Sequence, residues 1–299
     1  MSASGVLILA GPTASGKSEL AIALATRFDA EIVGADSRQI YRGMPIGTAA
    51  PTPAQRAAVP HHLVDFLDPH ERYSAARFAH DATRAIEEIH SRGKRAIVVG
   101  GTGFYIRALT GDVGLAPQYD AAVRDRLARE ARLHPPEFLH GWLAARDPRR
   151  AAMLSPADTY RVTRALEVAL ADGVAARDDA PARGLRAAGI PFLKVGLDVP
   201  LPEIDERIAR RTDAMFEAGL IDEAERIGAD AVAADAVGYP QALAYLRGWS
   251  TDAEMRATLA RATRRYARRQ RSWLRSEPDL IWARASSVAA LARERLAWT

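Results

Sequence analysis

The alternation of apolar and polar positions along the chain predicts short buried strands separated by amphipathic helices. Each expected strand is a short run of mostly apolar residues, and each expected helix carries apolar residues at helical spacing. In the N-terminal third the expected elements are strands at Val6–Ala10, Glu31–Ala35, His62–Phe66 and Arg95–Val99 and helices at Glu19–Phe28 and Ser74–Arg92, the second capped by Ser74. This alternation favours an α/β fold with a doubly wound parallel sheet.

The pattern changes in the middle of the chain, where charged helical segments replace the strands. Between residues 116 and 186 prolines interrupt the helical periodicity, and no run has the composition of a strand. Strand and helix patterns then return, with strands expected at Phe192–Val199 and Leu280–Trp282 and helices at 202–218, 220–229 and 252–275. We therefore expect one α/β core domain formed by residues 1–115 and 187–299, and a helical insertion domain at 116–186.

A glycine-rich segment directly after the first expected strand matches the phosphate-binding P-loop motif at every position. The segment consists of Gly11, Pro12, Thr13, Ala14, Ser15, Gly16, Lys17 and Ser18. In such a loop successive backbone N–H groups face one anion, and the following helix adds the positive end of its dipole. Lys17 would neutralise phosphate charge, and the Ser18 hydroxyl would hold Mg²⁺. The motif predicts phosphate binding but does not say whether the phosphate belongs to ATP or to another molecule.

Two further loops follow expected strands and should meet the P-loop, because ligands of a doubly wound sheet bind beyond the carboxyl ends of its strands. One loop begins at Asp36 and the other is the glycine-rich segment 100–104. In a kinase Asp36 would hold Mg²⁺ through water, whereas in a transferase it would accept a proton from the attacking nucleophile. Asp36 or Ser37 could also simply cap a helix. The residues alone leave these roles open.

Composition narrows the classes of protein to which the chain can belong. The absence of cysteine excludes a disulfide scaffold, a thiolate zinc site and a cysteine nucleophile. The sequence shows neither a signal peptide nor an apolar stretch long enough to span a bilayer, so we expect a cytoplasmic protein without a membrane partner. The net charge is +4, and nearly all positive charge is arginine, with lysine only at Lys17, Lys94 and Lys194.

Positive charge is concentrated in the expected helix at 252–275. No acidic residue lies between Glu254 and Glu277. Helical spacing places Arg264, Arg268, Arg271 and Arg275 on one face and Leu259, Ala262, Tyr266 and Trp273 on the opposite, core-facing side. An arginine stripe is commonly a solvated face, and nucleic-acid phosphates are the alternative partner. Arg161 and Arg164, in the expected insertion, form a second and smaller basic candidate.

Nine segments spread along the chain, of which the P-loop is the first, resemble those of a known protein family. In chain order they are GPTASGKS, ADSRQIYRGMPIGTA, PHHLVDFLDP, YSAARFAHDA, VGGTGFYIRAL, DTYRVTRALEV, ERIARRTDAMFEAGLIDE, AVGYPQAL and TRRYARRQRSWLR. Together they resemble the bacterial tRNA dimethylallyltransferases, also called tRNA isopentenyltransferases, over nearly the whole chain. The resemblance implies a P-loop core with a helical insertion. It also implies transfer of the dimethylallyl group from dimethylallyl diphosphate, with Mg²⁺, to N6 of the adenosine immediately 3′ of the anticodon (position 37) in tRNAs that read codons beginning with U.

The resemblance also implies roles for individual residues. The P-loop and Arg211, which matches the family position better than Arg210, would bind the diphosphate, and Lys17 would help to stabilise its charge as it leaves. Asp36 would orient the N6 amine and take its proton, while Thr102 would lie near the reaction channel and contact tRNA. Further contacts with the tRNA anticodon stem-loop are expected from Ser37, Arg38, Gln39, Arg124, Arg161, Arg164, Arg268, Arg269, Gln270 and Arg271.

The chain departs from the family pattern at four positions. These are Pro45, Ala50, Arg77 and Pro240, where the family usually has aspartate, lysine, aspartate and a basic residue. None of the four is one of the residues to which the resemblance assigns catalysis or diphosphate binding.

Three alternative functions share parts of these features. A small-molecule kinase would use the P-loop and a strand-end aspartate but would not need a basic helix. An isopentenyltransferase acting on free AMP, ADP or ATP would need neither the insertion nor the arginine stripe. A non-catalytic RNA-binding protein would not need the full set of catalytic positions. The resemblance favours the tRNA-modifying transferase, and we expect it to act as a monomer.

Overall fold

The computed structural model of the chain describes residues 5–114, 121–172 and 184–299. The chain divides into two compact units, of which the larger is formed by Met1–Val113 with Arg183–Thr299 and the smaller by Gly114–Ala182. The start that we expected for the insertion, at 116, lies outside the described residues.

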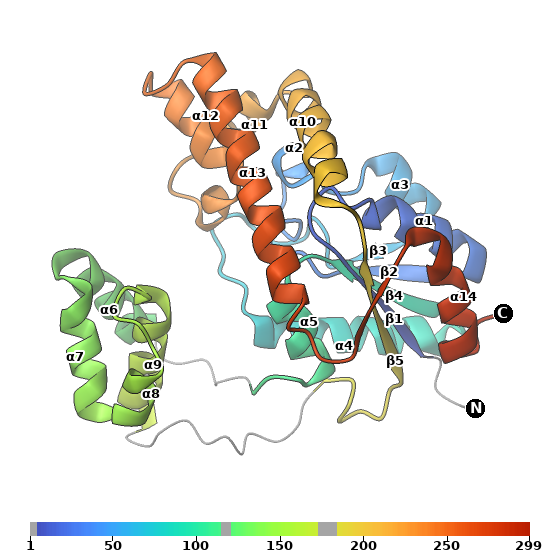
Figure 1. The fold of residues 1–299 in the computed structure, drawn as a ribbon, viewed down its shortest axis with the longest axis horizontal. Coiled ribbons are helices and arrows are strands. Elements are labelled where there is room, and N and C mark those ends of the chain that lie inside the picture. Colours follow the sequence, from blue (N-terminus) through green and yellow to red (C-terminus); the bar gives the residue numbers. More distant parts are fainter. Residues whose placement is uncertain (1–4, 115–120, 173–183) are drawn as a thin grey trace. The chain divides into compact units, whose positions relative to one another are not determined.

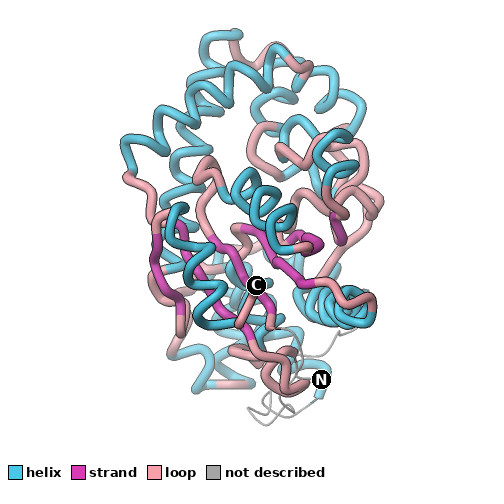
Figure 2. The backbone as a smooth tube through the Cα atoms, turned by 90° about the vertical axis from the view of Figure 1, so that its right-hand side faces the viewer, coloured by secondary structure: helices cyan, strands magenta, loops and turns pink. Residues whose placement is uncertain are grey.

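The larger unit is built on a six-stranded sheet (Figures 1 and 2). Every strand pair in it is parallel. In chain order the strands are β1 (Val6–Ala10), β2 (Ala30–Gly34), β3 (His61–His62), β4 (Arg95–Gly100), β5 (Phe192–Leu197) and β6 (Leu280–Ala283). Their order across the sheet is β3-β2-β4-β1-β5-β6. The three loops of interest follow β1, β2 and β4, which are neighbours in the sheet. The expected α/β class is confirmed, and parallel pairing brings these loops to one edge.

Helices cover both faces of this sheet. The helices of the larger unit are α1 (Lys17–Phe28), α2 (Pro45–Thr48), α3 (Pro53–Ala58), α4 (Ala75–Ser91), α5 (Gly103–Thr110), α10 (Leu201–Glu217), α11 (Leu220–Ile227), α12 (Tyr239–Leu246), α13 (Asp252–Leu274) and α14 (Ala285–Leu296), with a short 3₁₀ turn at Val232–Asp235. Helices α4 and α5 pack on one face, and α1 and α14 pack on the other (Figure 1). Helix α13 packs along α10 and α12.

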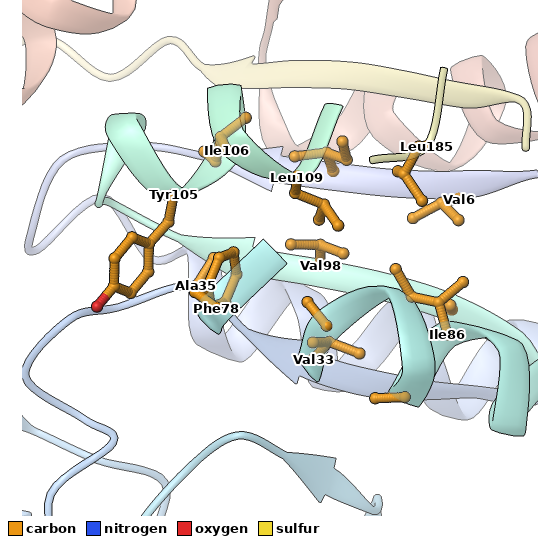
Figure 3. Packing of buried hydrophobic residues seen from close by; sticks show 14 of the residues in the cluster. Val6, Val33, Ala35, Phe78, Ile86, Val98, Tyr105, Ile106, Leu109 and Leu185 are labelled. Atoms are coloured by element: carbon orange, nitrogen blue, oxygen red, sulfur yellow. The ribbon is translucent and has the colours of Figure 1, made fainter. Parts of the chain in front are cut away.

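The core on the α4–α5 face is a continuous apolar layer. Figure 3 shows Phe78 and Ile86 of α4 and Ile106 and Leu109 of α5 packed against side chains of the strands, among them Val6, Val33 and Val98. All seven are fully shielded from water. Burial of such side chains stabilises a fold by about 1.5–3 kcal/mol each, so this layer fixes the sheet from which the functional loops project.

Most expected elements are present, and the main error concerns the third strand. We expected His62–Phe66, whereas β3 contains only His61 and His62. The backbone leaves the extended region immediately afterwards, since Leu63 and Asp65 have φ angles of 57° and 56°. Such angles end a strand because they turn the chain away from its neighbour.

Five helices of the larger unit were not expected from the sequence: α2, α3, α5, α12 and α14. α2, α3, α5 and α12 have eight residues or fewer, too few to show a clear helical period, whereas α14 has 12 residues and its pattern was simply missed. Two of the departures from the family pattern fit these helices, because Pro45 is the first residue of α2 and Pro240 lies in the first turn of α12. The first turn tolerates proline, since its N–H groups have no partner within the helix.

The smaller unit is helical throughout its described part. Its helices are α6 (Ala121–Leu133), α7 (Pro136–Arg146), α8 (Pro148–Ala152) and α9 (Thr159–Asp172). Pro136 and Pro148 begin α7 and α8, which explains why prolines interrupt the helical pattern. A separate apolar cluster holds these helices together, formed chiefly by Leu127, Leu139, Leu143, Val162 and Leu166.

Candidate active site

The P-loop connects β1 to α1 and forms a tight cradle. Ala14 and Gly16 both have left-handed φ angles, of 62° and 83°, which turn the backbone toward the start of α1. Ser15 donates its backbone N–H to the Pro12 carbonyl across this turn (3.2 Å). The Ser15 hydroxyl is buried and has no hydrogen-bond partner among the residues that the structure describes. A buried hydroxyl without a protein partner needs a water molecule or a ligand atom to complete its hydrogen bonding.

Lys17 lies buried in this cradle. Its Nζ donates to the Pro12 carbonyl oxygen (3.3 Å). Burial lowers the pKa of Lys17 to about 8; the carboxylate of Asp36 opposes this effect, and the nearby guanidinium of Arg211 adds to it. The lysine is therefore poorly compensated by the protein, and a bound anion would stabilise its charged form.

Arg211 reaches the loop from α10. Its Nη1 donates to the Thr13 hydroxyl (3.0 Å), and its Nη2 donates to the carbonyl of Thr48 (3.4 Å). Its Nε is buried without a hydrogen-bond partner among the described residues, and burial lowers the pKa of Arg211. The neighbouring Arg210 is exposed. The structure thus separates two adjacent arginines that sequence reasoning distinguished only by resemblance.

Arg207 is a site residue that the sequence analysis missed. It lies one helical turn before Arg211 on α10, and its Nη1 donates to the carbonyl of Ala14 in the P-loop (3.4 Å). The spacing of four residues, which places two arginines on the same helix face, was the available signal. Arg207 also forms an ion pair with Glu203, so its charge is more fully compensated than that of Arg211.

Ser37, the residue after Asp36, connects Asp36 to Thr102. Ser37 donates its backbone N–H to the Thr102 hydroxyl oxygen (3.0 Å), and the Thr102 hydroxyl lies 3.4 Å from the Ser37 hydroxyl. The Asp36 carboxylate accepts the backbone N–H of Arg38 (2.9 Å), so it closes a turn and does not cap a helix. One small cavity is lined by Lys17, Ser18, Asp36 and Gln39 together with residues of β2, β3 and β4 and the loops beside them, including His61. The phosphate side and the acceptor side therefore meet.

Gln39 and Arg38 have protein partners of their own. The Gln39 amide donates to the carbonyls of Thr48 (3.1 Å) and Ala49 (3.0 Å). Arg38 forms an ion pair with Asp235 (2.7 Å). Gln39 and Arg211 thus converge on the same carbonyl, that of Thr48, which ties α2 to the site.

The arginine-rich face of α13 differs from the stripe that we expected. Arg268 pairs with Asp205 (2.8 Å), Arg264 approaches the same carboxylate (3.8 Å), and Arg271 pairs with Asp198 (3.4 Å). Although α13 itself has no acidic residue between Glu254 and Glu277, its charge is partly compensated, because Asp205 of α10 and Asp198 before it face the stripe. A shallow basic groove remains, lined by Arg261, Arg264, Arg265, Arg268, Arg269 and Ser272.

The buried side of α13 is also rotated from the expected one. The fully buried residues of this helix are Met255, Leu259, Ala267, Gln270 and Leu274. Ala262, Tyr266 and Trp273, expected in the core, are only partly buried. Gln270, expected to face tRNA, is 6% exposed and bonded to the P-loop and to Gly101. Its amide is thus directed away from the arginine surface, because its position in the helical repeat faces the sheet.

The arginines of the smaller unit meet carboxylates of the same unit. Arg124 pairs with Glu167 (2.9 Å), Arg164 pairs with the same side chain, and Arg161 pairs with Asp158 (3.3 Å). The Glu167 side chain is 5% exposed. Although burial acts to raise the pKa of Glu167, hydrogen bonds from Arg124 and Arg164 lower it. These arginines are held in fixed positions with part of their guanidinium groups exposed.

Two features that the described residues lack bear on other functions. They contain no cluster of histidine, cysteine, aspartate or glutamate suited to a metal ion held by side chains alone. No helix within the described ranges has both the length and the apolar character needed to cross a membrane.

Known proteins with similar sequences and structures point to one family. The family model described as IPP transferase matches residues 39–277. The tRNA dimethylallyltransferase of Anaeromyxobacter sp. (strain K) is 47% identical over 296 residues, which cover 97% of this chain and 97% of that protein. The crystal structure of the full-length tRNA isopentenylpyrophosphate transferase from Bacillus halodurans matches with a TM-score of 0.71 at 35% identity, covering 98% of this chain and 97% of that one.

A eukaryotic dimethylallyltransferase acting on tRNA, also solved by crystallography, matches with a TM-score of 0.79 at 25% identity. That match covers 98% of this chain and 77% of the eukaryotic one. The sequence relatives and the solved structures therefore agree over nearly the full length of the chain. The chain belongs to the IPP transferase family.

Proposed function

We propose that the chain transfers the dimethylallyl group of dimethylallyl diphosphate to N6 of adenosine 37 in tRNA, next to the anticodon on its 3′ side. The names of the relatives support this function. The single observation that carries it is the meeting of an anion cradle with a carboxylate, since Lys17, Ser18 and Asp36 line one cavity.

The reaction exchanges one bond for another at the allylic carbon. The bond from this carbon to the diphosphate oxygen breaks, and a bond to N6 forms. Diphosphate leaves with the bonding electrons, and the amine loses one proton. The protein must therefore stabilise negative charge on one side of the carbon and remove a proton on the other.

The diphosphate side is the P-loop. Backbone N–H groups from Ala14 to Ser18, the buried Lys17 ammonium and Arg211 would face the leaving oxygens. Donors fixed in place before the reaction stabilise developing charge without reorganising, and one such donor is typically worth about 10²–10³ in rate. The buried Ser15 hydroxyl and Arg211 Nε, which have no partner among the described residues, fit this use.

Ser18, at the start of α1, also suits Mg²⁺. The Ser18 hydroxyl, which lines the cavity, is an oxygen ligand of the kind that this ion prefers. Ser18 would hold the ion. When bound there, Mg²⁺ supplies positive charge to the diphosphate oxygens.

The acceptor side is formed by Asp36 and Thr102. One carboxylate oxygen of Asp36 is engaged by the Arg38 N–H. The other has no hydrogen bond within the described part of the chain, and it would accept the N6 proton. Thr102, held against Ser37, would line the path of the incoming base. A base stacked in an anticodon loop must be extruded to reach such a pocket.

Binding of tRNA would use the basic groove of α13 and the arginines of the smaller unit, which we propose is the insertion domain. Contacts of this kind are chiefly with phosphates and make affinity dependent on salt. The enzyme would act as a monomer in the cytoplasm, where its tRNA substrate is found.

The proposed function can be tested by mass spectrometry of nucleosides after incubation with dimethylallyl diphosphate and Mg²⁺. One reaction contains an unmodified tRNA transcript with adenosine at position 37, and parallel reactions contain AMP, ADP or ATP. We expect N6-dimethylallyl adenosine only with tRNA. Product only with free nucleotides would identify a nucleotide isopentenyltransferase. No product in any reaction would contradict prenyl transfer and direct attention to a kinase.

A further inference from the structure

Gln270 connects two loops of the site from the buried side of α13. Its Oε1 accepts the backbone N–H of Thr13 in the P-loop (2.8 Å), and its Nε2 donates to the carbonyl of Gly101 (3.0 Å). Gln270 lies 257 residues from Thr13 and 169 residues from Gly101 along the chain. Both polar atoms of one buried side chain are thus used to join loops that follow β1 and β4.

The fit around this amide is close. A Cβ atom added to Gly101 would lie 2.2 Å from Gln270 Nε2 and 3.1 Å from the carbonyl oxygen of Gly11. Any side chain at position 101 would therefore displace either the amide or the P-loop. The glycine allows the loop that carries Thr102 to lie directly against Gln270.

The contacts continue from Gln270 to both sides of the site. Toward the diphosphate side, Thr13 is held twice, since Arg211 donates to its hydroxyl while Gln270 accepts its N–H. Toward the acceptor side, the residue after Gly101 is Thr102, whose hydroxyl accepts the N–H of Ser37 beside Asp36. The Gln270 amide therefore links the residues that would stabilise the leaving diphosphate to those that would contact the attacking amine.

We propose that Gln270 is a positioning residue that fixes the separation between the diphosphate loop and the Thr102–Asp36 side of the site. This inference rests on the proposed function. Transfer requires the allylic carbon and N6 to approach in line, and small errors in such geometry are costly, about 10²-fold for a displacement of 1 Å. A rigid bridge between the two loops controls that distance.

A purely structural role explains the contacts less well. Helix α13 is already anchored by buried apolar residues, including Leu259, Ala267 and Leu274. An apolar side chain at position 270 would serve the same packing without the cost of burying an amide. The amide is instead satisfied by the two loops of the site, which indicates that their relative placement is what it provides.

The inference can be tested with Gln270→Met, which has a similar volume and makes neither hydrogen bond. We expect kcat to fall about 10- to 100-fold, with the Kd for tRNA unchanged within about twofold. Leu259→Ala, on the same buried side of α13 but about three turns from Gln270 and close to Gly238, is the matched control. It should lower the melting temperature as much or more while leaving kcat near the wild-type value. Gln270→Glu, which keeps the acceptor for Thr13 but loses the donor to Gly101 when ionised, serves if the Met variant does not fold, and the same loss of kcat is expected.

A double-mutant cycle adds a readout that general destabilisation would not produce. Gly101→Ala should lower kcat in the wild-type background, because the added methyl group meets the Gln270 amide. In the Gln270→Ala background that clash is gone, so Gly101→Ala should lower kcat by a several-fold smaller factor. Additive losses in kcat would overturn the proposed bridge.

The outcomes separate this inference from the proposed function. Wild-type protein that transfers no dimethylallyl group to tRNA would overturn both. Wild-type transfer combined with an unchanged kcat in the Gln270→Met variant, or with a loss explained wholly by a weaker Kd for tRNA, would overturn the positioning role alone.

Discussion

The arginines at the P-loop and those on the outer face of α13 have their charge balanced in different ways. At the P-loop, the described residues offer Arg211 only a hydroxyl and a carbonyl as hydrogen-bond partners, and they leave its Nε without one. On α13, Arg268 and Arg271 are paired with carboxylates at distances of 2.8 and 3.4 Å. The first arrangement is incomplete without an anion, whereas the second is satisfied in the free protein.

This difference separates two uses of positive charge. A buried cation without a carboxylate is costly unless a ligand compensates it, so Arg211 and Lys17 should act strongly on bound diphosphate. When an arginine paired at the surface binds a tRNA phosphate, it exchanges a carboxylate partner for a phosphate. Each such arginine therefore contributes only modestly to the free energy of tRNA binding. Loss of the first kind should change turnover, and loss of the second should change affinity and its dependence on salt.

The largest effect is expected from Asp36→Ala. Removing the carboxylate that takes the N6 proton should lower kcat by about 10²–10⁴-fold, the usual contribution of a general base. The Kd for tRNA should change little, because most affinity comes from phosphate contacts. The two quantities are measured by single-turnover kinetics and filter binding. Normal turnover together with abolished tRNA binding would contradict the role assigned to Asp36.

Arg211→Ala sharpens the comparison between buried and exposed cations. We expect kcat to fall about 10²–10³-fold, as for removal of one preorganised donor. Arg210→Ala is the matched control, since it removes the same charge from an exposed neighbour. Its kcat should stay within about twofold of wild type, and equal losses in the two variants would show that general charge, not the buried geometry, matters.

The pKa of Lys17 gives a prediction for pH. Because burial lowers this pKa to about 8, Lys17 is charged in the free enzyme below that pH and neutral above it. Once the ionisation of diphosphate itself is corrected for, the Kd for inorganic diphosphate should be flat below about pH 7 and should rise above pH 8, approaching tenfold per pH unit. Titration calorimetry measures this directly. Lys17→Arg keeps its charge and should show no such break, whereas an identical break in that variant would assign it to another group.

The smallest effect on activity is expected from substitutions on the arginine-rich face of α13. Replacing Arg268 and Arg271 with alanine should raise the KM for tRNA several-fold and leave kcat close to wild type. The slope of log Kd against log salt should become shallower by about 0.7–0.9 for each tRNA phosphate that the variant no longer neutralises. A slope equal to that of the wild type would show that this face does not touch tRNA.

The sheet and the phosphate side of the site could be predicted from the sequence, because short contiguous segments determine them. The P-loop motif, the strand before it and the helix after it lie within one short segment, and the structure brings them together as expected. Asp36 and Thr102 follow strands β2 and β4, which lie on the same side of β1 in the sheet, so parallel topology was enough to place them nearby. Burial in the core followed directly from apolar periodicity.

The remaining features depend on interactions that local patterns do not contain. The inward direction of Gln270 depends on how α13 is rotated against the sheet, and alternating arginines obscured its apolar side. The pairing of Arg268 with Asp205 depends on α10 lying beside α13. β3 is short because Leu63 and Asp65 have positive φ angles. Such angles are uncommon for residues other than glycine, so the sequence did not predict them.

The most direct test of the central claim is to locate the modified nucleotide after reaction of the wild-type protein with dimethylallyl diphosphate, Mg²⁺ and a pair of tRNA transcripts. One transcript carries adenosine at position 37, and the other carries guanosine there with adenosines retained at the flanking positions. Nuclease digestion and mass spectrometry should find one dimethylallyl group at position 37 of the first transcript and none in the second. Equal prenylation of both transcripts, or of neither, would contradict a site in which the P-loop and Asp36 act together on that base.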